Sequence, residues 1–266
     1  MRSLAAALGL TLLSASTLLS QQRAVPRPTP GQGRAIPRTE SAVPYKVGET
    51  LNYDVSWSSF IVAGTATASV REKRPSNDST AYYVVVEGKP VPLVARLYPL
   101  YYKMESLIDS YDLLSQRGSL YAEEGGDRRT STTRFDRAGR RAMFEQKTDT
   151  TLTANLTIPP QTQDGLAAFY SLRTRTFKSG DRLTIPVADS GALYTASVNV
   201  GSVETVAVPF GRTPARKLQL DITDSDNQPV WKNVAVWMSN DARRLPIKLQ
   251  AELPVGSFVL ALRDAR

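Results

Sequence analysis

The 266-residue chain contains neither histidine nor cysteine. Without an imidazole or a thiol, it cannot build a Ser-His-Asp triad, a Cys-His nucleophile pair, a thiolate metal site or a redox dithiol. Carboxylate, lysine, tyrosine and hydroxyl groups remain, but none of them occurs at the spacing of a known catalytic device. We therefore predict a non-enzymatic protein with no catalytic residue, no metal and no cofactor. A carboxylate-based hydrolase is kept as an alternative.

Long apolar runs are also scarce, and the one that exists lies at the start of the chain. Residues 4–19 read LAAALGLTLLSASTLL, after a basic residue at position 2 and with small residues toward their end. This pattern is typical of a secretory signal peptide, which we place at residues 1–20, with cleavage after Ser16 or near Ser20. A membrane anchor or a buried helix are the alternatives, although the run is shorter than the roughly 20 residues that span a bilayer.

Large apolar side chains are nearly absent from residues 21–44, which are instead rich in proline and arginine. Such a composition buries too little surface to offset the entropy of ordering the chain. We predict a disordered linker here. Its basic residues leave open a second interpretation, an arm that contacts anionic lipid headgroups.

The formal net charge of +8 is spread along the chain rather than gathered in one block. The densest basic stretch, residues 128–141, is interrupted by acidic residues and preceded by Glu123 and Glu124. Alternating charges of this kind favour a solvated outer face of a sheet, whereas nucleic-acid binders concentrate basic charge and interleave aromatic residues. We expect no nucleic-acid partner.

Period-two alternation dominates after residue 47. Leu51, Tyr53, Val55 and Trp57 alternate with polar residues, as in a strand with one buried face. Further strands are predicted at 65–70, 81–86, 102–108, 119–121, 130–135, 141–146, 182–187, 194–206, 215–222, 232–238, 247–253 and 257–262. The fold class is mainly β: a large antiparallel, curved sheet, half-barrel or sandwich-like, over residues 45–266. The alternative is that these strands divide into two subdomains.

One stretch has a helical period instead. Asp164 suits a helix N-cap, and Leu166, Phe169, Tyr170 and Arg173 follow at i, i+3, i+4 and i+7. We predict one short helix over residues 165–175 that covers part of the sheet. Residues 91–98 have room for a second short helix between two prolines.

Three blocks of this sequence resemble a bacterial family of secreted proteins, domain-of-unknown-function family 3108. They are VGETLNYDVSW with AGTATASV (47–57 and 63–70), DGLAAFYSLRTRTFKSGDRLTIPV (164–187) and VWMSNDARRLPIKLQAELPVGSFVLAL (236–262). The resemblance implies a β-rich protein of the periplasm or outer-membrane periphery of a Gram-negative bacterium. It also implies a sheet similar to the half-barrels of lipoprotein carriers and related lipid-binding proteins. It implies no catalytic residue.

Aromatic and apolar residues provide the candidate ligand site. The run LVARLYPLYYKM (93–104) is apolar and bounded by prolines, which indicates a flap over a hydrophobic groove, next to the predicted helix. The alternative is that these residues close the core, and that the helix residues form only a cap and an interface. The predicted ligand-binding residues are Leu93, Leu97, Tyr98, Tyr101, Tyr102, Phe169, Tyr170 and Arg173.

A second candidate is the turn around Asp241, where Arg243 and Arg244 together form a possible fork for a carboxylate or phosphate. The alternative interpretation is an Asx-type turn, in which Asp241 accepts hydrogen bonds from backbone N–H groups.

The sequence thus favours an exported envelope protein that binds an apolar or amphipathic ligand, a lipid or a lipid-linked glycan, in a concave sheet. The alternative is a scaffold for envelope assembly that acts through contacts with other envelope proteins. Peripheral membrane contact is compatible with both. No feature of the sequence indicates an oligomeric state.

Overall fold

The computed structural model describes residues 38–57, 61–253 and 256–266, and residues 38–266 form one compact unit. The predicted signal peptide and the predicted linker up to residue 37 lie outside the described residues. Residues 38–44, which the sequence assigns to the linker, contact the sheet. The Ser41 N–H donates to the Ser110 carbonyl at 2.8 Å, and Val43 packs against a core cluster.

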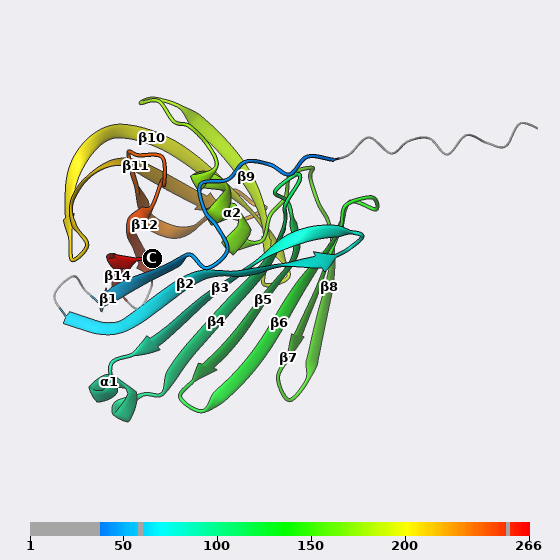
Figure 1. Ribbon diagram of the computed structural model, residues 1–266. Coiled ribbons are helices and arrows are strands. Elements are labelled where there is room, and N and C mark those ends of the chain that lie inside the picture. The colour runs from blue at the N-terminus through cyan, green and yellow to red at the C-terminus, as the bar shows by residue number, and fades with distance from the viewer. Residues whose placement is uncertain (1–37, 58–60, 254–255) are drawn as a thin grey trace, which may run out of the picture. The chain divides into compact units, whose positions relative to one another are not determined.

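The unit is built around one antiparallel sheet of fourteen strands (Figure 1). The first eight are β1 (Thr50–Trp57), β2 (Ile61–Ser76), β3 (Ser79–Pro90), β4 (Leu100–Asp109), β5 (Ser115–Glu124), β6 (Asp127–Asp136), β7 (Arg141–Lys147) and β8 (Thr151–Thr157). The last six are β9 (Arg182–Asp189), β10 (Ala192–Val208), β11 (Gly211–Thr223), β12 (Pro229–Ser239), β13 (Pro246–Leu253) and β14 (Gly256–Ala265). The predicted fold class, a large curved antiparallel sheet, is confirmed.

Neighbouring strands in the sheet are consecutive in sequence, with one exception, the pair β1 and β14. Within β1–β8 and within β9–β14 each strand pairs with the next strand in sequence, β1 pairs with β14, and β8 and β9 are the two edges and do not pair. Two meanders, β1–β8 and β9–β14, are therefore fused through the β1–β14 ladder into a single sheet. The sequence missed β8, because its residues TLTANLT are mostly polar and exposed.

The sheet curls without closing into a barrel. The turn between β10 and β11 bends back to β14, where the Phe210 N–H donates to the Leu262 carbonyl at 2.9 Å. At the edges, Gln163 forms a parallel bridge with Val187 of β9. A Cβ added to Gly191, in the turn after β9, would lie 2.9 Å from the Phe144 ring on β7. The region near β7 and β8 and the region near β9 are thus in contact through the Gln163 bridge and the Phe144 ring, although β8 and β9 do not pair.

Two helices complete the fold, α1 (Pro92–Leu97) and α2 (Gly165–Arg173). Helix α2 was predicted and ends two residues earlier than expected, and α1 lies in the stretch where the sequence left room for a second helix. The Asp164 carboxylate accepts from the Ala167 N–H at 2.9 Å, which confirms its role as N-cap. In the part of the chain that the structure describes, neither helix has the length and apolar character needed to cross a membrane.

Helix α2 lies within the curl of the sheet and buries two faces (Figure 1). Leu166, Ala167 and Tyr170 pack against a cluster from the first meander, which includes Tyr82 and Ile108. The opposite face packs against a cluster from the second meander, whose members include Ile185, Val198 and Leu218. About two and a half turns of apolar helix therefore join the cores of the two meanders.

Arg173, at the end of α2, is fully buried. Its guanidinium donates to both carboxylate oxygens of Glu49 at 2.5 and 3.0 Å, and to the carbonyls of Arg243 and Arg244, each at 3.2 Å. Burial by itself lowers the pKa of Arg173, but hydrogen bonds and charge from Glu49 outweigh it and raise the pKa. The guanidinium thus stays charged and ties α2 to the residues before β1 and to the β12–β13 turn.

Replacing Arg173 with Met is expected to lower the free energy of unfolding by about 3–5 kcal/mol, because it leaves the Glu49 carboxylate buried and unpaired. The matched control is Arg263→Met, since Arg263 pairs with Asp54 at 3.0 Å on the surface and such pairs contribute about 1 kcal/mol or less. Urea unfolding followed by circular dichroism measures both. Equal losses in the two variants would contradict the role assigned to Arg173.

Candidate functional site

A largely apolar cavity of about 470 Å³ lies between α2 and the second meander. Strands β9–β14 supply most of its wall, and one face of α2 supplies the rest. This volume falls in the range of small-molecule binding sites, roughly 300–1,000 Å³. The lining residues are Gly165, Ala168, Phe169, Leu172, Ile185, Val187, Asp189, Ser190, Tyr194, Ala196, Leu220, Ile222, Val230, Trp231, Val234, Ala235, Val236, Leu249, Gln250, Ala251, Phe258 and Leu260.

The space exists because small residues stand where the helix and sheet face each other. Gly165, Ala168, Phe169 and Leu172 follow helical spacing and place one face of α2 on the cavity. Two of these four have little or no side chain, and Ala196 stands on the wall provided by β10. Larger residues at these positions would fill the cavity.

The cavity opens at the β11–β12 end of its wall. Val230 and Trp231 line it and are 39% and 48% exposed. Large apolar side chains at a rim are in contact with both water and the interior. This rim therefore gives an apolar molecule a route to the cavity.

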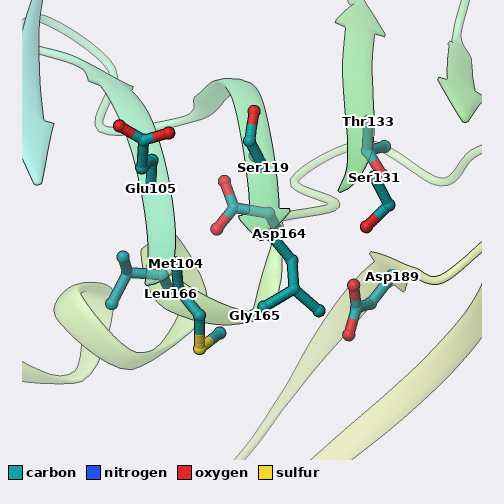
Figure 2. A pocket seen from close by; sticks show the side chains of 11 residues that line it. Met104, Glu105, Ser119, Ser131, Thr133, Asp164, Gly165, Leu166 and Asp189 are labelled. Atoms are coloured by element: carbon teal, nitrogen blue, oxygen red, sulfur yellow. The ribbon is translucent and has the colours of Figure 1, made fainter. Parts of the chain in front are cut away.

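A smaller recess of about 40 Å³ lies beside the cavity, and Met104, Leu120 and Leu166 supply apolar parts of its lining. We call it the polar recess because carboxylates and hydroxyls also line it. Gly165 and Asp189 line both hollows, and Asp164, Ser131 and Thr133 line only the recess (Figure 2). Glu105 and Ser119 also border the recess, but Glu105 accepts from the Tyr83 hydroxyl and Ser119 contacts the Thr132 hydroxyl at 3.4 Å.

Local backbone geometry places Asp164 in this recess. Besides capping α2, its carboxylate accepts from the Ser106 hydroxyl at 2.7 Å, and its backbone N–H donates to the Ser115 hydroxyl at 2.7 Å. A Cβ on Gly118 would lie 2.7 Å from the Asp164 Cβ, so only glycine on β5 leaves room for it. The capping residue is thus held from three elements.

Both aspartates of the recess bind their protons more tightly than usual. Burial raises the pKa of the Asp164 carboxyl, although hydrogen bonds from Ala167 and Ser106 act in the opposite direction. Asp189 remains accessible to solvent, but the surrounding walls displace part of its water. This desolvation raises the pKa of the Asp189 carboxyl, and the hydrogen bond from the Ser190 N–H partly offsets it.

The predicted ligand-binding residues fall into three separate places. Phe169 alone lines the apolar cavity. Leu93, Leu97 and Tyr98 lie on or just after α1 and are 71%, 82% and 51% exposed. The alternative that Leu93 and Leu97 close the core is therefore wrong, and their contact with a ligand stays a prediction.

The remaining predicted residues have structural partners. The Tyr101 hydroxyl donates to Glu87 at 2.8 Å, and the Tyr102 hydroxyl donates to Glu124. Tyr170 is buried in the core, with its ring edge-on to Tyr45 at 5.2 Å.

The Arg243–Arg244 pair does not form an open fork. Asp241 accepts from the N–H groups of Arg243 and Arg244 at 3.1 Å each, as the Asx-turn interpretation expects. The Arg244 guanidinium donates to the Arg173 carbonyl and to the Thr176 hydroxyl. The backbone carbonyls of Arg243 and Arg244 accept hydrogen bonds from the buried Arg173 guanidinium, and this is the contact that the turn provides.

Sequence reasoning missed most of the cavity. Its wall residues alternate in strands and were assigned simply to a buried face. Only the glycine and alanines on α2 and β10 indicate open space, and they do so only once the facing elements are known. Ser131 and Thr133 were missed because the surrounding arginines mark the stretch as a solvated face. Among the described residues, no cluster of three acidic side chains suits a metal ion.

Asp164→Asn is expected to gain stability relative to the unmodified protein as pH rises from 3.5 to 7. A raised pKa means that the contribution of Asp164 to stability is fully present below its ordinary value of 3.8 and is lost as pH rises through the folded-state pKa. Asparagine keeps the capping oxygen and does not ionise, whereas Asp164→Ala removes the cap at a cost of about 1 kcal/mol. Urea unfolding across this pH range tests the expectation, and parallel pH profiles would refute it.

Comparison with known proteins adds the family and the fold. A search of curated proteins finds no match. Among solved structures, a beta-barrel-like protein of domain of unknown function DUF1849 from Brucella abortus is 10% identical, with a TM-score of 0.52, and the match covers 82% of this chain and 96% of that one. At this identity the likeness concerns the fold alone.

Two further solved structures match with lower scores. They are a putative exported protein with YmcC-like fold from Bacteroides fragilis, at 10% identity and TM-score 0.34, and a putative lipoprotein from Parabacteroides distasonis, at 6% and 0.35. Each match covers 86% of this chain and 100% of the other. The family described as "Protein of unknown function (DUF3108)" matches residues 52–263. This span includes nearly the whole sheet with α2, and the chain belongs to that family.

Proposed function

We propose that this is an exported, non-enzymatic protein of the bacterial envelope that binds an apolar or amphipathic ligand of the lipid class. The observation that carries the proposal is the cavity of about 470 Å³ between α2 and β9–β14, with its almost entirely apolar wall. The signal-like N-terminus supports export.

The energetics of the wall favour hydrocarbon over water. Aliphatic and aromatic side chains offer water few hydrogen-bond partners, so a cavity of this kind stays dry or takes up an apolar molecule. Each methylene that moves from water into such a site contributes about 0.8 kcal/mol. An alkyl chain of roughly ten carbons then contributes about 8 kcal/mol before the cost of association is subtracted.

Ala196→Phe is expected to weaken binding of the fluorescent apolar probe N-phenyl-1-naphthylamine at least tenfold, because the phenyl ring enters the cavity from β10. Ala207→Phe is the matched control on the same strand, since Ala207 is exposed and lines neither hollow. Fluorescence titration measures binding, and thermal unfolding checks that both variants fold. Unchanged affinity in Ala196→Phe, or no binding by the unmodified protein, would contradict the proposal.

A second candidate function, peripheral contact with a membrane, rests on α1. Leu93, Leu97 and Tyr98 are exposed together with Arg96 on this short helix and the residue that follows it. Apolar and aromatic side chains beside a cation are typical of segments that lie in the headgroup region of a bilayer. The exposed set would then dock the protein on the membrane from which it takes its ligand.

Leu97→Asp is expected to reduce sedimentation with phosphatidylglycerol vesicles roughly tenfold, the equivalent of losing one buried leucine. Leu152→Asp on β8 is the control, because Leu152 is 59% exposed and remote from α1 in sequence. Both variants should keep their melting temperature. Equal sedimentation of the two would remove the membrane candidate, and loss of probe binding in Leu97→Asp alone would instead support the predicted flap.

A further inference from the structure

The apolar cavity and the polar recess are neighbouring hollows, so a ligand that reached both would meet two chemically different ends. Gly165 and Asp189 line both, and a Cβ on Gly165 would meet nothing within 4 Å. The first residue of α2 therefore leaves a passage between the two ends. A molecule with an apolar tail and a small polar head matches this layout.

The polar end contains unused hydrogen-bonding groups. Ser131 and Thr133 are only 7% and 5% exposed, and within the described part of the chain no hydrogen bond engages either hydroxyl. Both hydroxyl oxygens remain accessible from the recess, so a polar group of a ligand can take the place of water as their hydrogen-bond partner. Figure 2 shows the side chains of Ser131 and Asp189 extending toward the same space.

The charge of the polar end has one sign. Asp164, Asp189 and Glu105 line the recess, and no Lys or Arg occurs among the described residues that line either hollow. Lys103 pairs with Glu105 at 2.9 Å, which neutralises that carboxylate. Arg137 approaches from outside, but its guanidinium donates to the carbonyls of Thr162 and Ser115. Among the described residues no cation pairs with Asp189, so an anionic headgroup beside it would face an uncompensated carboxylate.

We propose that the recess selects the polar end of the ligand, and that this end donates hydrogen bonds and carries no negative charge. The proposal rests on the proposed function and adds the chemical class of the headgroup. Asp189 accepts from the headgroup, and Ser131 and Thr133 complete the contact. The recess of about 40 Å³ has room for roughly three water-sized groups, which fits an ammonium or the hydroxyls of a glycerol.

The test compares three ligands with the same sixteen-carbon chain at pH 7.5: hexadecylamine, 1-monopalmitoylglycerol and palmitate. Each ligand is titrated against protein-bound N-phenyl-1-naphthylamine at concentrations below the ligand's critical micelle concentration, and displacement of the probe is measured by fluorescence. We expect the amine or the glyceride to compete at least tenfold better than palmitate, and whichever is stronger identifies the headgroup. Because the chain carries a net charge of +8, non-specific attraction would favour palmitate instead.

Two variants assign the preference to the recess. Asp189→Asn should reduce the preference over palmitate at least fivefold, whereas Asp149→Asn, at an exposed turn, should leave it unchanged. Thr133→Val is nearly isosteric and should weaken the preferred ligand about threefold to tenfold without affecting the probe.

Each outcome has a distinct meaning. Equal competition by all three ligands, or a preference for palmitate, overturns the headgroup assignment while probe binding still supports the cavity. A preference that persists in both Asp189→Asn and Thr133→Val also overturns it. Failure of the probe to bind the unmodified protein would instead reject the proposed function itself.

Discussion

The buried ion pair between Arg173 and Glu49 is the contact on which the rest of the structure depends. Desolvating two charges is expensive, and the geometry here offsets the cost through a bidentate pair and two backbone carbonyls. The rings of Tyr45 and Tyr170 lie 5.4 Å from the guanidinium and complete its surroundings. Because the pair fixes the end of α2 within the curled sheet, it also fixes the helix face that borders the cavity.

The same contact gives a physical meaning to the three blocks that resemble the family. The first block contains Glu49, the second contains α2 with Arg173, and the third contains the β12–β13 turn whose carbonyls accept from Arg173. Segments more than 60 residues apart in the chain therefore meet at one guanidinium. The Asx turn at Asp241 orients the carbonyl groups of that turn, so Arg243 and Arg244 contribute backbone acceptors to the Arg173 guanidinium.

The structural features that depend on neighbouring residues in the chain could be predicted from the sequence. The alternation of Leu51, Tyr53 and Val55 identified β1, and Asp164 marked the start of α2, because a side-chain period and a cap depend on neighbouring residues. The polar strand β8 was missed because pairing with β7, rather than burial, defines it. The burial of Arg173 was missed since its partner lies 124 residues away. The cavity depends on which small residues face each other across the curl, and no local pattern specifies that.

The central claim is that the hollow between α2 and the second meander holds an amphipathic molecule. The polar recess and the apolar cavity share Gly165 and Asp189 in their linings, and the proposed ligand would place its head in the first and its chain in the second. Native mass spectrometry of the protein, purified gently from its own envelope and then extracted under denaturing conditions, tests this most directly. The account predicts a bound species of defined mass, released on denaturation, with an alkyl chain and a headgroup without negative charge. A ligand-free mass, together with no uptake of added hexadecylamine or monopalmitoylglycerol, would contradict it.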